Sequence, residues 1–167
     1  ANSSQITDGA CSVLLASEAA IKRHNLSPLA RLNPAQWAGV DPSQMGLGPA
    51  NAITATLKSH NLALDEIDYF EINEAFAAQV QACVIALNNE KYCKNDLGLN
   101  TVVGNIPNDR LNIDGGAISL GHPVGASGAR IVLHLATILQ RKQASKGIAS
   151  LCIGGGQGGA ILVEAIQ

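Results

Sequence analysis

Short apolar runs, separated by glycine, proline and polar residues, divide the chain into alternating strand-like and helix-like segments. Short apolar runs between turn residues are typical of buried strands, whereas longer apolar stretches with helical spacing indicate helices. The pattern predicts strands at 10–16, 29–33, 67–72, 111–114, 147–153 and 159–165. It predicts a short helix that opens at Ser17, and longer helices at 50–60, 74–88 and 122–142.

Two stretches interrupt this alternation. Residues 38–50 are predicted to form a loop, because they contain five residues that break helices and strands: Gly39, Pro42, Gly46, Gly48 and Pro49. Residues 89–110 are mostly polar and read as an excursion from the fold, with Cys93 as a loop thiol. The glycine run at 154–158 joins the last two strands as a hairpin.

The alternation of strands and helices favours an α/β fold, in which helices cover the faces of a mixed, largely parallel sheet. The helices at 74–88 and 122–142 carry apolar residues on most sides, which is typical of buried helices. A chain of 167 residues is long enough for one domain with its own core.

The composition suggests a surface that something else covers. Hydrophobic residues make up 47% and charged residues only 14% of the chain, against about 25% charged residues in an average soluble domain. A missing partner domain or an oligomer interface would explain this. The net charge of −2 gives no basic footprint for nucleic acid, and no apolar run reaches the length of about 20 residues that a membrane span needs.

The four cysteines lie too far apart for a zinc site, so we expect no metal. Cys11 and Cys83 read as core residues, and a reducing, intracellular setting fits them best.

His122 is the first candidate for chemistry. It stands where a long helix begins, and the positive end of a helix disfavours a protonated imidazole. A neutral imidazole could act as a base towards a thiol. The alternative is an incidental histidine in a glycine-rich helix entry. His134, among apolar neighbours in the same helix, reads as a core histidine with its polar atoms satisfied.

Asn73 and Cys152 each follow or end a predicted strand. Asn73 could cap the helix at 74–88, with Glu74 complementing the helix dipole, or contact a ligand at a strand–helix junction. Cys152 could be structural, or it could border an oxyanion hole formed by the unshielded N–H groups of the glycine run.

Taken in order, these motifs resemble the C-terminal half of a thiolase. The matching signature segments are Asn73–Gln79, Asp114–Arg130 and Leu151–Gly159. The opening Asn2–Ala10 is similar to the segment where the thiolase C-terminal domain begins, and 39–49 is similar to a further thiolase segment.

The resemblance implies a layered βαβαβαββ domain over residues 1–167, with 89–110 as an excursion within it. It also implies that the N-terminal domain, which carries the nucleophilic cysteine, is absent, so that the isolated chain is inactive. The intact acyltransferase would condense acetyl-CoA or cleave 3-ketoacyl-CoA, as in fatty acid metabolism and β-oxidation. Coenzyme A thioesters would be substrates, with no permanently bound cofactor.

The resemblance also assigns roles. The histidine that matches His122 activates the nucleophile and helps to bind the thioester oxygen, together with a water held by the asparagine that matches Asn73. The cysteine that matches Cys152 moves the proton at the substrate α-carbon, and the N–H that matches Gly154 joins an oxyanion hole. Positions near the pantetheine arm of coenzyme A match Ser4, Met45 and Phe76.

Two other readings remain open from the sequence. A β-ketoacyl synthase shares the fold, but it uses a Cys-His-His set, which Asn73 and Cys152 do not fit. A stand-alone domain that binds acyl-CoA or assists assembly, without catalysis, belongs to a different class. Expected partners are coenzyme A or acyl-CoA, the missing N-terminal half and further copies of the protein. The expected location is the cytoplasm, or a mitochondrial or peroxisomal matrix.

Overall fold

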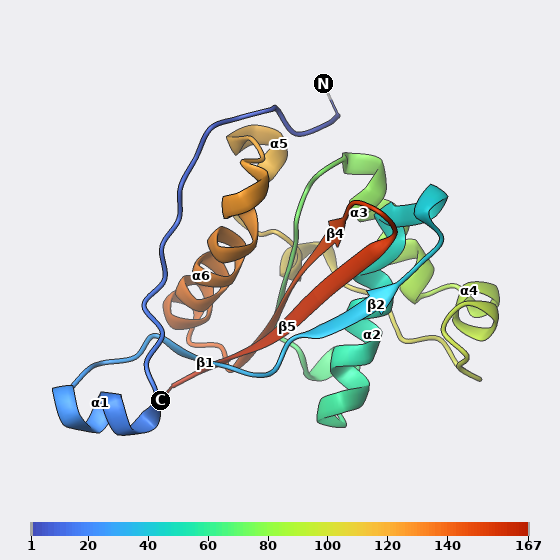
Figure 1. The fold of residues 1–167 in the computed structure, drawn as a ribbon. Coiled ribbons are helices and arrows are strands. Elements are labelled where there is room, and N and C mark those ends of the chain that lie inside the picture. The colour runs from blue at the N-terminus through green and yellow to red at the C-terminus, as the bar shows by residue number, and fades with distance from the viewer. Residues whose placement is uncertain (1, 167) are drawn as a thin grey trace.

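A five-stranded sheet lies between two layers of helices in the computed structural model, which describes residues 2–166 (Figure 1). The strands are β1 (Ala30–Leu32), β2 (Gln36–Gly39), β3 (Tyr69–Ile72), β4 (Lys146–Ile153) and β5 (Gln157–Ala165). Strand β3 pairs in parallel with β4, while β5 pairs antiparallel with β4, β1 and β2.

The expected mixed α/β sheet is confirmed. Because β1, β2 and β4 all oppose β5, and β3 runs with β4, four of the five strands point in one direction. The sheet is therefore largely parallel in strand direction. Its hydrogen-bonded pairings are nevertheless mostly antiparallel, because β5 lies between β4 and the two short strands.

Helices cover both faces of the sheet. On one face lie α2 (Gly48–His60) and α3 (Ala77–Leu87), and on the other lies α6 (Val124–Lys142). The shorter helices are α1 (Glu18–His24), α4 (Glu90–Asn95) and α5 (Ala117–Leu120). Three 3₁₀ turns complete the fold: η1 (Pro42–Leu47), η2 (Leu64–Glu66) and η3 (Asn108–Arg110).

Two apolar clusters, one on each face of the sheet, form the core. Ile148 of β4 and Leu162 of β5 pack towards α2 and α3, whereas the next residue on each strand, Ala149 or Val163, packs towards α6. Successive side chains of a strand point to opposite faces. Both faces of β4 and β5 are therefore buried, which explains why their sequences are nearly continuous apolar runs rather than alternating ones.

The prediction of a buried strand at 10–16 is wrong for this structure. Residues 10–16 pair with no strand among the described residues, and the side chains of Leu14 and Leu15 are 85% and 73% exposed. A strand needs a neighbour to satisfy its backbone, and the N-terminal segment instead runs outside the sheet, past α5 and α6 (Figure 1). Most of its apolar side chains are exposed among the described residues, and Cys11, predicted as a core residue, is only half-buried.

Several boundaries also differ from the predictions. The loop expected at 38–50 contains η1 and the start of α2, because proline is well suited to the first turn of a helix, where Pro42 and Pro49 lie. The strand expected at 111–114 is reduced to one parallel bridge between Leu111 and Phe70. It stops there because Asn112 takes a positive φ of 44°.

The excursion at 89–110 is more ordered than its polarity suggested. It contains α4 and η3, and Cys93 is fully buried in α4, not a loop thiol. The Cys93 thiol reaches the carbonyl oxygens of Ala86 and Leu87 at the end of α3. The buried Cys93 side chain, together with Tyr92, which packs against the core, places α4 against the rest of the fold.

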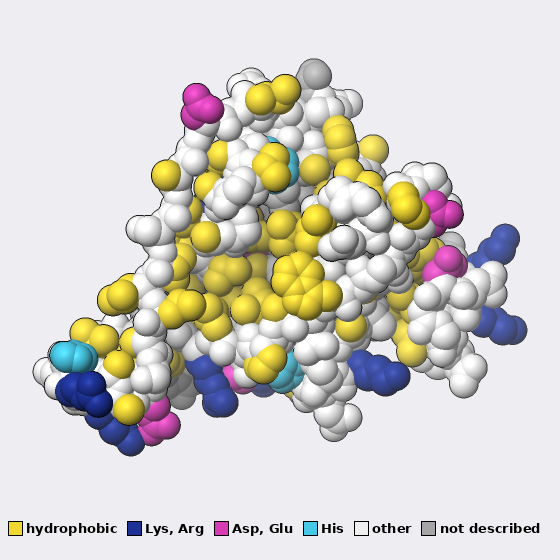
Figure 2. Space-filling view, viewed as in Figure 1, with side chains coloured by type: hydrophobic (Ala, Val, Ile, Leu, Met, Phe, Trp, Pro, Cys, Tyr) yellow, Lys and Arg dark blue, Asp and Glu magenta, His cyan; other side chains and the backbone are white. Residues whose placement is uncertain are grey.

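Burial of the helix at 74–88 is only partial. Helix α3 begins at Ala77, and its outer face exposes Ile85 to 63%. Figure 2 shows hydrophobic side chains gathered in the middle of one face of the molecule, beside the N-terminal segment. The even apolar distribution along α3 reflects a core on one side and an uncovered surface on the other.

Candidate active site

The parallel pairing of β3 and β4 brings two sequence-predicted residues to one edge of the sheet. Asn73 directly follows β3 and its backbone N–H donates to the Ser150 carbonyl of β4, at 2.9 Å. Cys152 lies near the end of β4. Because parallel strands end at the same edge, and ligands commonly bind at that edge, this is where a site is expected.

His122 reaches this edge from a distant part of the chain. It lies between α5 and α6, and its Nε2 is 3.3 Å from the amide nitrogen of Asn73, a residue 49 positions earlier. Its backbone N–H donates to the Gln5 carbonyl at 3.0 Å. The structure therefore brings His122 and Asn73 into contact.

Ser127 determines which nitrogen of His122 carries the proton. Its hydroxyl lies 2.6 Å from Nδ1 of His122 and donates to the Pro123 carbonyl at 3.2 Å. Since the single hydroxyl hydrogen is used there, we assign the Nδ1–H of His122 as the donor to Ser127. Nε2 is then unprotonated and accepts from the Asn73 amide, and an imidazole in this form can act as a base.

The surroundings of His122 also favour its neutral form. Burial lowers the pKa of His122 below its ordinary value, and the nearby Arg130 guanidinium lowers it further. The sequence predicted a neutral imidazole from the start of the helix, whereas the structure adds burial and a fixed positive charge. The Arg130 guanidinium also donates to the Gly121 carbonyl at 2.9 Å, immediately before His122.

Asn73 is buried, with 2% of its surface exposed, and its Oδ1 has no hydrogen-bond partner among the described residues. Its interpretation as a helix cap is wrong, because α3 begins four residues later and Phe76 precedes it. A bridge between Ser3 and Phe76 keeps this stretch extended. The Asn73 side chain is thus free to turn towards His122.

Cys152 and Gly154 lie at the end of β4 and in the hairpin that follows it. Burial raises the pKa of Cys152, so its thiol is protonated at neutral pH. Cys152 makes no hydrogen bond with His122 or Asn73 in the described part of the chain. A Cβ added at Gly154 would meet nothing within 4 Å, so one side of this backbone is open.

Residues 2–7, here called the N-terminal strap, hold two parts of the site together. Ser4 donates to the Ala75 carbonyl from its backbone at 3.0 Å and from its hydroxyl at 3.2 Å. Gln5 accepts from His122. Ser4 therefore lies close to Phe76, the residue after Ala75, whose side chain is half exposed.

Met45 is placed on the same side of the sheet as α3. It lies in η1, whose Gly46 carbonyl accepts from the Cys83 thiol of α3 at 3.1 Å.

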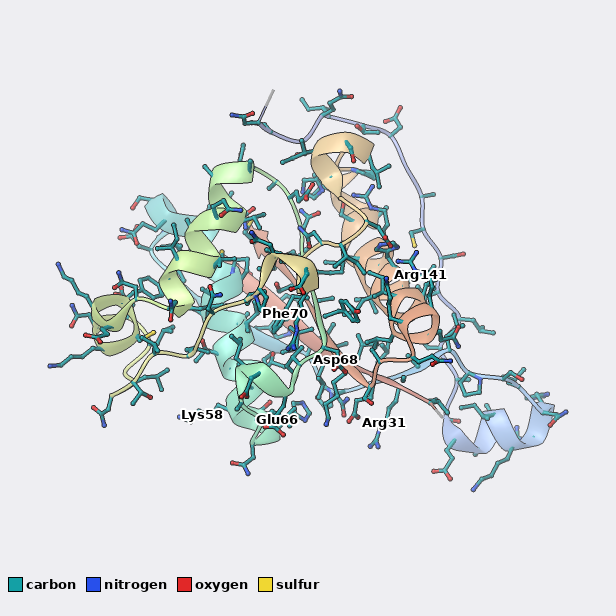
Figure 3. All side chains as sticks on the ribbon, turned by 180° about the vertical axis from the view of Figure 1, so that it is seen from behind. Arg31, Lys58, Glu66, Asp68, Phe70 and Arg141 are labelled. Atoms are coloured by element: carbon teal, nitrogen blue, oxygen red, sulfur yellow. The ribbon has the colours of Figure 1, made fainter. Side chains whose placement is uncertain are left out.

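A cluster of titratable side chains lies between β3 and α6, close to the site. His134 of α6 is 3.2 Å from Asp114 and 3.9 Å from the buried Glu71, and Arg141 also pairs with Asp114. Figure 3 labels Arg141, on α6. His134 is therefore partly exposed, with carboxyl groups beside its ring, and its interpretation as a core histidine is only partly right.

Glu71 is the most perturbed member of this cluster. Burial, followed by the charges of Asp114 and Glu74, raises the pKa of Glu71 to about 8, against an opposing effect of Arg130. Its Oε1 has no hydrogen-bond partner among residues 2–166. The group borders a cavity of about 100 Å³ that also reaches Asn73.

The sequence did not predict that three residues contact or support the loop that carries His122. These residues are Ser127, Glu74 and Arg130. Ser127 follows Gly125 and Ala126 and precedes Gly128, and it is fully buried. A hydroxyl among such small residues points to close packing with a nearby polar group, and that signal was available. The partners of Glu74 and Arg130 lie far along the chain or across a turn, and no local pattern identifies them.

The described residues include no cluster of three His, Cys, Asp or Glu side chains that could hold a metal ion. Within residues 2–166, no helix is both long enough and apolar enough to cross a membrane.

Comparison with known proteins matches nearly the whole chain. The family model described as the C-terminal domain of thiolase matches residues 26–165. Over 163 residues, the chain is 44% identical to a mitochondrial 3-ketoacyl-CoA thiolase of Pongo abelii. The match covers 98% of this chain but only 37% of that relative, so the chain spans less than two fifths of its length.

Solved structures show the same relation. The crystal structure of the Bacillus anthracis acetyl-CoA acetyltransferase matches with a TM-score of 0.83 and 41% identity, over 99% of this chain and 38% of that one. Human mitochondrial 3-ketoacyl-CoA thiolase in complex with CoA matches with a TM-score of 0.76 and 41% identity, over 91% of this chain and 34% of that one.

Proposed function

The chain belongs to the thiolase family, and we propose that it is the C-terminal catalytic part of a thiolase that transfers acyl groups to or from coenzyme A through a cysteine acyl-enzyme. The observation that carries this proposal is the hydrogen-bonded series Asn73–His122–Ser127. It leaves a neutral imidazole, with an unprotonated Nε2 that accepts a long hydrogen bond from Asn73, at the edge of the sheet where Cys152 also lies.

His122 is proposed to be the base for the nucleophilic cysteine. A free cysteine thiol has a pKa of about 8.5 and needs a base to become a thiolate at neutral pH. The hydrogen bond from the Asn73 amide to Nε2 is long, at 3.3 Å, and therefore weak enough for an incoming thiol to replace. Once protonated, Nε2 becomes a donor and can hold the thioester oxygen.

Asn73 is proposed to hold a water that contributes to the same oxyanion site. Its buried Oδ1 without a partner supports this, since buried polar atoms normally make a hydrogen bond. A water held there could donate to a developing negative oxygen, and preorganised donors of this kind are a large source of rate enhancement.

Cys152 is proposed to move the proton at the substrate α-carbon. In the cleavage direction, the nucleophilic cysteine attacks the 3-keto carbon and the bond between the α- and β-carbons breaks. The resulting enolate of acetyl-CoA then takes a proton from the Cys152 thiol. The raised pKa of Cys152 keeps this proton in place at neutral pH. In condensation the same thiol must first lose its proton.

Gly154, Ser4, Met45 and Phe76 are proposed to bind the substrate. The open backbone at Gly154 suits an N–H that approaches the enolate oxygen. The half-exposed Phe76 beside Ser4 offers an apolar surface next to a hydroxyl, which fits a pantetheine arm.

Residues 1–167 are proposed to act as one C-terminal domain, although the family match starts at residue 26. The contacts of the N-terminal strap with Ala75 and His122 support including the first residues. The other half of the site would come from the N-terminal part that the longer relatives carry, with the nucleophilic cysteine. Homo-oligomers in the cytoplasm, or in a mitochondrial or peroxisomal matrix, complete the proposal.

The test uses this chain joined to the N-terminal part of a thiolase. Thiolytic cleavage of a 3-ketoacyl-CoA would be measured for wild type and for His122→Ala, with His24→Ala, an exposed histidine on α1, as the matched control. We expect His122→Ala to lower kcat by about 10²–10⁴-fold, the usual contribution of a general base, and His24→Ala to have no effect. Near-normal turnover of His122→Ala would remove His122 from this role.

A further inference from the structure

The loop Asn112–Gly121 carries His122 to Asn73, and its first residue is fixed to β3. The Asn112 side chain accepts from the backbone N–H of Ile72 at 2.8 Å and donates to the Ile72 carbonyl at 2.9 Å. It thus makes both hydrogen bonds that a neighbouring strand would make. The start of the loop is anchored one residue before Asn73.

Glu74 holds the middle of the same loop. One carboxylate oxygen accepts from the backbone N–H of Ile118 at 3.1 Å, and the other accepts from the Asn112 side chain at 3.3 Å. The sequence suggested that Glu74 complements the start of the helix at 74–88. The structure shows that it accepts at the start of α5 instead, in the loop that ends at His122.

The loop is shaped to receive this carboxylate. A Cβ at Gly116 would lie 2.8 Å from Cδ and 2.9 Å from Oε2 of Glu74, so a larger residue would push the carboxylate out. Gly115, with a φ of +80°, makes the turn directly before Gly116. The position of Glu74 therefore requires Gly116, and the positive φ of the turn favours Gly115.

Asn73 and Glu74 are adjacent in sequence and act on the same structure from two sides. Asn73 contacts the imidazole ring of His122, and Glu74 holds the backbone that delivers that ring. We propose that Glu74 is a positioning residue, which sets the distance between His122 and Asn73 by tying Asn112 and the start of α5 to the end of β3. This inference rests on the proposed function for its kinetic consequence, but not for its structural one.

A purely structural role for Glu74 predicts something different. Loss of its hydrogen bonds would then lower the stability of the fold and leave the environment of His122 unchanged. A positioning role predicts that the His122 loop moves. Because burial and Arg130 together lower the pKa of His122, a displaced loop should bring that pKa back towards its ordinary value.

The experiment compares Glu74→Gln and Glu74→Ala with Glu90→Gln, an exposed glutamate on α4 that serves as the control. All are made in the full-length protein, that is, this chain joined to its N-terminal part. The titration of His122 is followed by NMR of labelled histidine, assigned with His122→Gln, and the thermal midpoint and the kinetics of cleavage are measured in parallel. Glu74→Gln keeps the size of the side chain and one acceptor oxygen, so it should fold if Glu74→Ala does not.

We expect the pKa of His122 to rise in Glu74→Ala and, to a smaller extent, in Glu74→Gln. We expect kcat to fall by about 10²-fold in Glu74→Ala, the effect of a small misplacement of a catalytic group, with KM changed by less than about twofold because no ground-state contact is lost. A lower thermal midpoint with an unchanged His122 titration would overturn the proposal. If the wild-type protein has no cleavage activity, but the pKa of His122 still rises in the Glu74 variants, the proposed function is refuted and the positioning role is supported.

Discussion

Individual side chains decide what this site can do, and their partners matter more than their identities. His122 can be a base because Ser127 takes its Nδ1–H and because burial and Arg130 favour the neutral ring. The Asn73 side chain can contact His122 because the Asn73 backbone is held by β4 and the side chain does not cap α3. The same residue types in other surroundings would be a solvent-exposed histidine and a helix cap.

Glu71 should make the stability of the protein depend on pH. Its pKa of about 8 lies above the ordinary 4.5, so the folded state holds a proton that the unfolded state releases. The contribution of Glu71 to stability is complete below about pH 4.5 and is lost as the pH rises through about 8. Glu71→Gln cannot lose this proton.

We therefore expect the free energy of unfolding of Glu71→Gln to change less between pH 5.5 and pH 8 than that of wild type. The difference should be about 3 kcal/mol from linkage between the two pKa values. Urea unfolding at the two pH values measures it, with Glu90→Gln as the exposed control. Parallel pH profiles for wild type and Glu71→Gln would contradict the raised pKa.

Among the secondary-structure elements, close packing of backbone places α2 directly against β5. A Cβ at Gly158 of β5 would overlap the carbonyl group of Gly48, where α2 begins. Neither partner is the flexible end of a side chain, so neither can move aside easily. This contact lies directly after η1, the turn that contains Met45.

Gly158→Ala should destabilise the fold by about 3 kcal/mol, the upper part of the usual range for overpacking. Gly39→Ala is the matched control, since a Cβ there would meet nothing within 4 Å, and it should change stability by less than about 0.5 kcal/mol. Urea unfolding of both variants tests the prediction. Equal stabilities would mean that α2 and β5 can separate without cost.

Considered as a whole, the molecule leaves apolar surface uncovered on several sides. Leu14 and Leu15 in the N-terminal segment, Ile85 on α3 and Val124 at the start of α6 are all exposed. Figure 2 shows further hydrophobic side chains gathered in the middle of one face of the molecule. Exposed apolar surface of this extent usually marks an interface. The low content of charged residues agrees with it.

We expect this chain on its own to self-associate, and to stop doing so when it is joined to the N-terminal part of a thiolase. Sedimentation velocity should show species larger than a monomer, and the double variant Leu14→Ser and Leu15→Ser should shift the distribution towards monomer. The control pair Glu18→Ser and Lys22→Ser removes an exposed ion pair on the neighbouring α1 and should change nothing. A monomeric wild-type chain would contradict an uncovered interface.

Local pattern was sufficient to locate most elements and the order of the site residues. Helices α2, α3 and α6 and strands β3, β4 and β5 all lie within a few residues of their predicted positions. Apolar periodicity and breaking residues act over a few neighbours, so a single sequence carries them. The same reasoning placed His122 at a helix entry and Asn73 and Cys152 at strand ends.

Contacts between distant residues required the folded chain. Residues 10–16 read as a strand because their side chains are apolar, but a strand exists only where a neighbour supplies hydrogen bonds, and none does so here. The Asn112 side chain makes the hydrogen bonds to Ile72 that a neighbouring strand would make. Glu74 accepts from the backbone N–H of Ile118 in α5, not from α3. Asn73 contacts His122, 49 positions later in the chain. Spacing along the chain does not encode such pairs, because they depend on how β3, α6 and the loop between them pack together.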